Sequence, residues 1–137
     1  ANAGYFVSKV LYEKQNGAKK FVVVDGAMND LLRPALYGAY HKIEAITDNA
    51  SEPRAVDIVG PVCESGDFFA KNYPLPELAH NDLVVVHSAG AYGFGMGSNY
   101  NTRGRSAEVA LKGGVAKLIR RRETFEDLIA LEQEFLD

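Results

Sequence analysis

The chain has 137 residues, a length that is typical of one domain. It is 47% hydrophobic and 24% charged, so it can fill one core and is neither disordered nor fibrous. A formal net charge of −3 argues against a nucleic-acid-binding surface. The one dense basic run, at residues 120–122, is followed at once by acidic residues, as in a solvated helix entrance.

Cysteine content and hydropathy limit the compartments and the bound groups that this protein is expected to have. The single cysteine, Cys63, excludes an internal disulfide and a cysteine-based zinc site, and a lone cysteine is typical of a reducing, cytoplasmic compartment. No cluster has metal-ligand spacing and no apolar run approaches the roughly 18 residues that span a bilayer, so neither a metal nor a membrane partner is expected. Residues 1–4 lack an initiator methionine and a basic region, which indicates a cut inside a longer chain rather than a signal peptide.

The first residues have the pattern of strands. Residues 6–12 are apolar and β-branched. Asn16-Gly17 predicts a hairpin, because both residues tolerate the positive φ of a type I′ turn. The continuous apolar run at residues 21–24 predicts a strand that is covered on both faces.

The middle of the chain is expected to alternate strands and loops. Pro34 and Gly38 limit residues 29–40 to a short helix or irregular turns. Polar turn formers predict an exposed loop at residues 47–54, and two prolines predict an extended connector at residues 73–76. Further strands are expected at residues 43–46, 55–62 and 83–86.

The last part combines a hairpin with a helix. Residues 107–122 predict a hairpin about Gly113-Gly114. Thr124 is a candidate N-cap with Asp127 in the position of its capping-box partner, and apolar residues recur at helical spacing as far as Phe135. The fold class expected is therefore mostly β, with six to eight strands and a C-terminal helix in a single domain that covers residues 1–137.

Cys63 and Glu64 could carry chemistry. They follow a predicted strand end at Gly60-Pro61, so a thiol and a carboxylate share a tight turn. A thiol can act as a proton donor or a nucleophile, and a carboxylate can bind an ammonium group. A buried structural cysteine is the alternative interpretation of Cys63, and the pair alone does not decide between them.

Two other segments could bind anionic groups. Arg33 and Tyr37 could offer a bidentate guanidinium and a phenol to a carboxylate, although a surface arginine and a core tyrosine are the simpler interpretation. Tyr92 lies in a glycine-rich run at residues 90–97, where freed backbone N–H groups could hold phosphate. That run lacks the pattern of a P-loop and of a dinucleotide fingerprint, so a flexible loop is the alternative.

Five motifs, in order, resemble the C-terminal part of the diaminopimelate decarboxylase family, pyridoxal 5′-phosphate enzymes that make L-lysine from meso-diaminopimelate. The motifs cover nearly the whole chain and lie at residues 30–41, 60–67, 89–94, 98–101 and 119–124. The resemblance implies the fold of group IV, alanine-racemase-like decarboxylases: a β-sandwich- or barrel-like C-terminal domain with short helices. The family joins it to a TIM barrel whose lysine holds the cofactor, and that barrel is expected to lie outside this chain, with residues 1–4 near the exit from it.

The resemblance also implies roles for five residues. Cys63 would be the catalytic proton donor after CO₂ leaves. Arg33 and Tyr37 would bind the distal carboxylate of the substrate, and Glu64 its distal amino group. Tyr92 would contact the cofactor phosphate and the substrate. The family works as a homodimer in which the residues matching Cys63 and Glu64 reach the partner subunit's site, so the expected partners are the protein's own N-terminal barrel, a second subunit and meso-diaminopimelate. The chain alone is expected to be inactive.

Two alternatives remain open. A related decarboxylase of ornithine, arginine or carboxynorspermidine would share the architecture, but a simple diamino acid offers no distal carboxylate to Arg33, and those enzymes resemble a Cys-Asp turn more than Cys63-Glu64. A non-catalytic, stand-alone β-domain would keep the sheet without the chemistry. The retention of every site position that this domain would supply argues against that second alternative.

Overall fold

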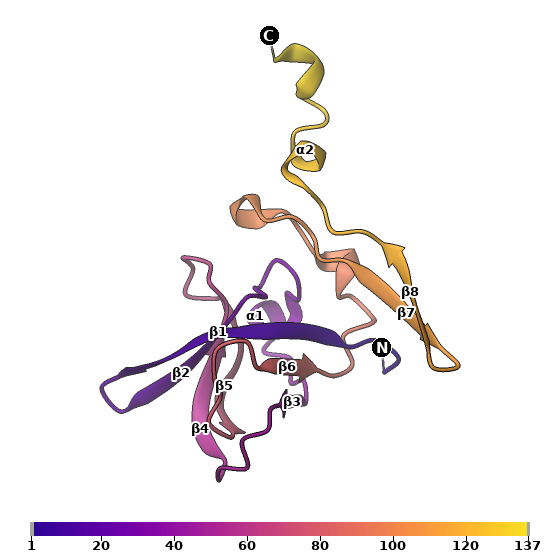
Figure 1. Cartoon of the computed structure of the whole chain (residues 1–137). Helices are drawn as coiled ribbons and strands as arrows, with labels where there is room; N and C mark the ends of the chain where they lie inside the picture. The colour runs from indigo at the N-terminus through magenta and orange to yellow at the C-terminus, as the bar shows by residue number, and fades with distance from the viewer. Residues whose placement is uncertain (1, 137) are drawn as a thin grey trace. The chain divides into compact units, whose positions relative to one another are not determined.

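A computed structural model describes residues 2–136, which divide between Gly97 and Ser98 into two compact units. The first unit contains six strands that form one sheet, with the order β3-β6-β1-β2-β4-β5 (Figure 1). Their bounds are β1 (Phe6–Asn16), β2 (Lys19–Val24), β3 (Ile43–Ile46), β4 (Arg54–Val59), β5 (Phe68–Leu75) and β6 (Leu83–Val86). The predicted mostly-β fold class is confirmed, whereas the single domain over residues 1–137 stays a prediction.

A bulge in β1 makes this sheet curl. The first part of β1 pairs with β6, from Phe6 opposite Val86, and the rest of β1 pairs with β2. A register shift between Val10 and Tyr12 lies within the β1–β2 pairing, just after the residues that pair with β6, and such a bulge bends a strand and increases its twist. The strand therefore belongs to both halves of the sheet, with β3 and β6 on one side of the bend and β2, β4 and β5 on the other (Figure 1).

One hydrophobic cluster forms the core of the first unit. As the continuous apolar run predicted, the three valines that end β2 are all buried, whereas β6 buries alternate residues and leaves the others half-buried. The core residues come from every strand of the sheet and from the connections between them: Val10, Val22, Val24, Leu31, Ile43, Val56, Ile58, Phe69, Leu75, Leu78, Val84, Val86 and Ala89.

The β1–β2 hairpin is present, but its turn differs from the prediction. Asn16 pairs with Lys19, so the two-residue loop consists of Gly17 and Ala18 rather than Asn16 and Gly17. Gly17 has a φ of 58°, and neither Asn16 nor Ala18 has a positive φ. A type I′ turn requires a positive φ at both central residues, so the type I′ prediction is wrong here. It fits the second hairpin instead, where Gly113 and Gly114 have φ values of 56° and 77°.

Strand β5 was largely missed by sequence reasoning, which placed only a connector at residues 73–76. Two features disguised it. Pro74 lies inside the strand and is tolerated because β5 is at the edge of the sheet, where its missing N–H leaves no gap in a ladder. Asn72 has a φ of 52° at an irregularity in the β4–β5 register, and its N–H donates to the Asp57 carboxylate at 2.8 Å.

The second unit is organised around Glu123. Its carboxylate accepts hydrogen bonds from the Arg105 backbone N–H (2.8 Å) and the Asn99 amide (2.7 Å), and it pairs with the Arg105 guanidinium. These bonds join the segment after Ser98 to the end of the hairpin formed by strands β7 (Glu108–Lys112) and β8 (Val115–Arg120). The predicted hairpin is thus confirmed with slightly shorter arms.

The C-terminal helix begins as predicted and ends early. Thr124 and Asp127 form the expected capping box at the start of α2 (Phe125–Leu128). The helical pattern predicted continuation to Phe135, but a turn follows α2 and only a 3₁₀ turn, η3 (Gln133–Phe135), comes after it. Leu131 and Phe135 are exposed and Leu128 and Ile129 are only half-buried, so little packing supports a longer helix, and short helices are marginal without it.

Candidate functional site

The turn from β4 to β5 presents Cys63 and Glu64 at the surface. The Cys63 thiol is free and exposed, so the alternative of a buried structural cysteine is wrong. The Glu64 N–H donates to the Val62 carbonyl at 2.8 Å, and the Asp67 N–H donates to the Glu64 carbonyl at 3.0 Å. The Gly66 N–H donates to Oε1 of Glu64 at 3.1 Å, so the carboxylate is oriented while it stays accessible. A thiol and a carboxylate therefore occupy consecutive positions on one ordered turn.

Arg33 and Tyr37 share the short helix α1 (Arg33–Tyr37), which has Pro34 in its first turn and is capped at its C-terminus by Gly38, whose φ is 61°. Because they lie four residues apart, their side chains lie on one side of the helix. Arg33 is half-buried and Tyr37 is 66% exposed. The core-tyrosine interpretation is therefore wrong, and the guanidinium and the phenol are placed so that both could contact one ligand.

Tyr92 lies in the loop that follows β6. It has a φ of 59° and is 66% exposed. A Cβ on the next residue, Gly93, would lie 2.3 Å from the Ala89 carbonyl oxygen, so only glycine fits there. The Ala89 N–H donates to the Gly4 carbonyl at 2.9 Å and holds the loop against the N-terminal segment. An accessible phenol on a fixed glycine loop fits a contact to a phosphate oxygen, since its O–H is a donor.

Histidines near the Tyr92 loop have structural partners. Nδ1 of His41, which is buried, lies 2.9 Å from the His87 carbonyl oxygen. Nε2 of His87 lies 2.5 Å from Oε2 of Glu44. The ammonium group of Lys42, with His87 second, lowers the pKa of the Glu44 carboxyl. These contacts hold the start of the loop that carries Tyr92.

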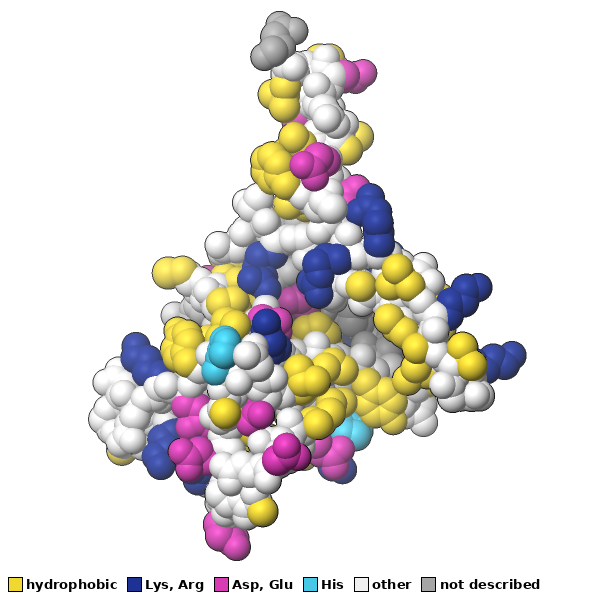
Figure 2. Space-filling model, viewed as in Figure 1, with side chains coloured by type: hydrophobic (Ala, Val, Ile, Leu, Met, Phe, Trp, Pro, Cys, Tyr) yellow, Lys and Arg dark blue, Asp and Glu magenta, His cyan; other side chains and the backbone are white. Residues whose placement is uncertain are grey.

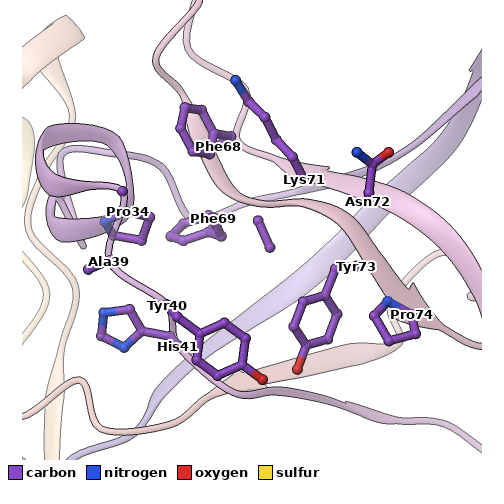
Figure 3. Close-up of a pocket in the computed structure, with 12 residues that line it drawn as sticks. Pro34, Ala39, Tyr40, His41, Phe68, Phe69, Lys71, Asn72, Tyr73 and Pro74 are labelled. Carbon is purple, nitrogen blue, oxygen red and sulfur yellow. The ribbon is translucent and has the colours of Figure 1, made fainter.

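A pocket of about 420 Å³ lies between the α1 end and β5. The rings of Tyr40 and Tyr73 stack on one wall of this pocket, with their centroids 6.3 Å apart (Figure 3). Phe68 and Lys71 line another wall. A hydrogen bond with Tyr73 raises the pKa of the Tyr40 phenol. The five predicted site residues lie outside this lining, whereas Glu64 lines a second pocket of about 330 Å³.

The structure thus groups the predicted site residues into three places in the first unit. Cys63 and Glu64 share a turn, Arg33 and Tyr37 share a helix, and Tyr92 occupies a loop of its own. All five are accessible to some degree. On the face of the molecule that Figure 2 shows, hydrophobic and acidic side chains lie close together. Within residues 2–136, no three His, Cys, Asp or Glu side chains gather as a metal site.

Sequence reasoning gave no role to Asp67, the residue that orders the Cys63–Glu64 turn. Its carboxylate is buried and accepts the N–H groups of Val62 and Met28, each at 2.7 Å. The one signal in the sequence was an acidic residue directly after a glycine and before an apolar pair, Phe68-Phe69.

No helix in the described part of the chain is long and apolar enough to cross a membrane.

Comparison with known proteins identifies relatives of this arrangement. The chain is 58% identical over 136 residues to a diaminopimelate decarboxylase of Campylobacter jejuni. The aligned residues cover 99% of this chain and 34% of the relative. It is 53% identical over 132 residues to one from Pseudomonas aeruginosa, covering 96% of this chain and 32% of the relative. The chain therefore spans about a third of the length of these curated relatives.

Solved structures agree with the sequence relatives. A diaminopimelate decarboxylase of Helicobacter pylori complexed with L-lysine superposes with a TM-score of 0.92 at 48% identity, over 99% of this chain and 33% of that one. A lysine/ornithine decarboxylase of Vibrio vulnificus, at 23% identity and a TM-score of 0.64 over 71% of this chain and 26% of that one, shares the fold alone. The family described as pyridoxal-dependent decarboxylase, C-terminal sheet domain, matches residues 2–90, and the chain belongs to this family.

Proposed function

We propose that the chain is the C-terminal β-domain of a diaminopimelate decarboxylase, a carboxy-lyase that converts meso-2,6-diaminopimelate to L-lysine and CO₂. The observation that carries the proposal is the 58% identity to the Campylobacter jejuni relative, along nearly the whole chain, together with the exposed Cys63-Glu64 turn. The lysine in the Helicobacter pylori complex is the expected product of the same reaction. We propose a cytoplasmic setting, because a single cysteine is typical of a reducing compartment.

Arg33, Tyr37 and Glu64 would bind the end of the substrate that does not react. That end carries a carboxylate and an ammonium group. A guanidinium can bind a carboxylate through two parallel hydrogen bonds, and the Tyr37 phenol can add a third. The Glu64 carboxylate would accept the ammonium group. A substrate with charges of both signs at its distal end would thus meet one cation and one anion, and an amino acid without the distal carboxylate would leave Arg33 unused.

Cys63 would supply the proton that replaces the departing carboxylate. Loss of CO₂ leaves an electron pair on carbon, the thiol S–H transfers its proton to that carbon, and solvent water returns a proton to the thiolate. The exposure of Cys63 allows this return. Proton transfer by a positioned side chain typically contributes about 10²–10⁴-fold to the rate.

Tyr92 would hold the phosphate group of the cofactor through its phenol O–H. Pyridoxal 5′-phosphate, when bound, draws away the electrons released as CO₂ departs. The residues of this chain fit the task of orienting the phosphate, whereas the lysine that holds the ring belongs, by the resemblance, to an N-terminal barrel. We propose that such a barrel and a second subunit are the partners, with Cys63 and Glu64 serving the partner subunit's site.

A chimeric enzyme tests this function. In it, this chain replaces the matching third of the Campylobacter jejuni relative, and CO₂ release is measured with pyridoxal phosphate and meso-diaminopimelate, ornithine or arginine. We expect release from meso-diaminopimelate alone. Release from ornithine or arginine instead would move the chain to the sister decarboxylases. A folded chimera that is inactive on all three would support a non-catalytic β-domain.

A further inference from the structure

We infer that Asp67 is a positioning residue that holds the Cys63–Glu64 turn in its working geometry and joins it to the segment leading into α1. Asp67 is 4% exposed, although its side chain carries a carboxylate. Oδ2 accepts the Val62 N–H at 2.7 Å, directly before Cys63, and Oδ1 accepts the Met28 N–H at 2.7 Å. Buried carboxylates need such donors, because an unsatisfied buried charge is strongly destabilising.

The backbone around Asp67 closes the turn from both sides. The Gly60 N–H donates to the Asp67 carbonyl at 3.2 Å, and the Asp67 N–H donates to the Glu64 carbonyl at 3.0 Å. Gly60 leaves room for the carboxylate, since a Cβ there would lie 2.4 Å from Oδ2 of Asp67. Gly60 has no positive φ, so its role is to leave space rather than to permit an unusual backbone. The turn is therefore built around one side chain.

The bond to Met28 extends this effect beyond the turn. Met28 lies in the connection between β2 and α1, the helix that carries Arg33 and Tyr37. Asp67 thus fixes, with two oxygens of one carboxylate, the turn that would donate the proton and the segment that leads to the helix binding the distal carboxylate. Because the inference assigns Asp67 to those residues' task, it rests on the proposed function.

Asp57 provides a matched comparison within the same sheet. It is 5% exposed, and its carboxylate also accepts a backbone N–H, from Asn72 at 2.8 Å, at the β5 bulge. It also pairs with Lys19 at 3.2 Å. Asp57→Asn should therefore disturb the sheet about as much as Asp67→Asn does, without changing the Cys63–Glu64 turn.

Amide hydrogen exchange, measured by NMR on this chain, tests the local effect. In Asp67→Asn, whose amide keeps one of the two acceptor oxygens, we expect at least one of the Val62 and Met28 amides to exchange about tenfold to a hundredfold faster, as for loss of a charged hydrogen bond, and in Gly60→Ala we expect this of both. In Asp57→Asn the Asn72 amide should exchange faster and those two should not. Gly66→Ala is the steric control, because its Cβ would meet Met28 at an ordinary 3.7 Å. The inference would be overturned if the Val62 and Met28 amides exchanged at unchanged rates in Asp67→Asn, or if both exchanged faster in Asp57→Asn.

Kinetics of the chimera separate positioning from mere stability. With kcat divided by the concentration of folded enzyme, we expect Asp67→Asn and Gly60→Ala to lower kcat on meso-diaminopimelate tenfold or more, and Asp57→Asn to leave kcat unchanged. Faster amide exchange with an unaltered kcat would overturn the positioning role. An inactive parent chimera with the expected amide pattern would refute the proposed function, yet it would support the hold of Asp67 on the turn.

Discussion

The thiol of Cys63 is exposed on a turn whose backbone is fixed on both sides by hydrogen bonds. A group in this position is suited to proton transfer and contributes little to the binding of the distal end. Cys63→Ala in the chimera should therefore lower kcat about 10²–10⁴-fold while KM for meso-diaminopimelate changes little. Steady-state kinetics measure both. A kcat equal to that of the parent would exclude Cys63 as the proton donor.

Arg33 would bind the far end of the substrate, so its replacement should change KM rather than kcat. Arg33→Ala removes charged hydrogen bonds worth about 1.5–3 kcal/mol, which corresponds to a rise in KM of roughly tenfold to a hundredfold. Arg122→Ala, which replaces an exposed arginine of the second unit, is the control. Equal KM values for Arg33→Ala and the control would refute the assignment of Arg33.

Single residues also differ in how readily the sequence suggests them as members of the candidate site. Cys63, Glu64, Arg33 and Tyr37 stand out in the sequence because their chemistry is visible in their side chains. Asp67 does not, because its role comes from burial and from a bond to Met28, which is distant in the sequence. Only the folded backbone brings Met28 to that carboxylate, so no local pattern could reveal the contact.

Among the elements, the Asn99–Arg105 segment depends on the charge of Glu123. Hydrogen bonds from the Arg105 backbone N–H and the Asn99 amide lower the pKa of Glu123. Because the folded-state pKa is lowered, the stabilisation is fully present above the ordinary glutamate pKa and is lost as pH falls through the lowered value. The Arg105 amide resonance, followed by NMR, should thus shift below about pH 4. Glu123→Gln should produce the shifted resonance at neutral pH, and Glu134→Gln should not. If the Arg105 amide resonance shifted neither at low pH nor in Glu123→Gln, the dependence of this segment on the charge of Glu123 would be contradicted.

The β1–β2 turn makes a prediction about stability. Gly17 has a φ of 58° with open space around it, so a side chain there meets no neighbour but adopts a strained backbone. Gly17→Ala should lower the free energy of unfolding by about 1–2 kcal/mol. Gly95→Ala is the control, because Gly95 also has open space but no positive φ. Urea titration measures the difference, and equal losses in the two variants would show that backbone strain is not the cause.

Elements with a long, regular pattern were predicted well, and those that depend on tertiary contacts were not. The valines of β2 announce a buried strand by themselves. Strand β5 contains Pro74 and a bulge at Asn72, and it is recognisable only once its edge position and the Asp57 bond are known. The helical spacing after Thr124 predicted more helix than forms, because the pattern indicates an apolar face and not whether anything covers it.

For the molecule as a whole, the hairpin of the second unit leaves an apolar face uncovered. Val109 pairs with Leu118 and Leu111 with Ala116, which places these four side chains on one face, and Leu111 is 78% exposed. We expect the isolated chain to self-associate as its concentration rises, and Leu111→Lys to weaken this association. Light scattering measures the average mass. Lys117→Gln, on the opposite face, is the control, and a parent that stays monomeric at high concentration would disprove the expectation.

The two pairings of β1 also set an order of events during synthesis on the ribosome. The β1–β2 hairpin has everything it needs once Val24 has emerged, because its partners are close in the sequence. The pairing of Phe6 with Val86 must wait until β6, the last strand of the sheet along the chain, has been translated. Until then, the first residues of β1 keep an unpaired strand edge, which is open to other nascent chains. Strand β1 is thus divided after Lys9 into a late-folding part, which pairs with β6, and an early-folding part, which pairs with β2.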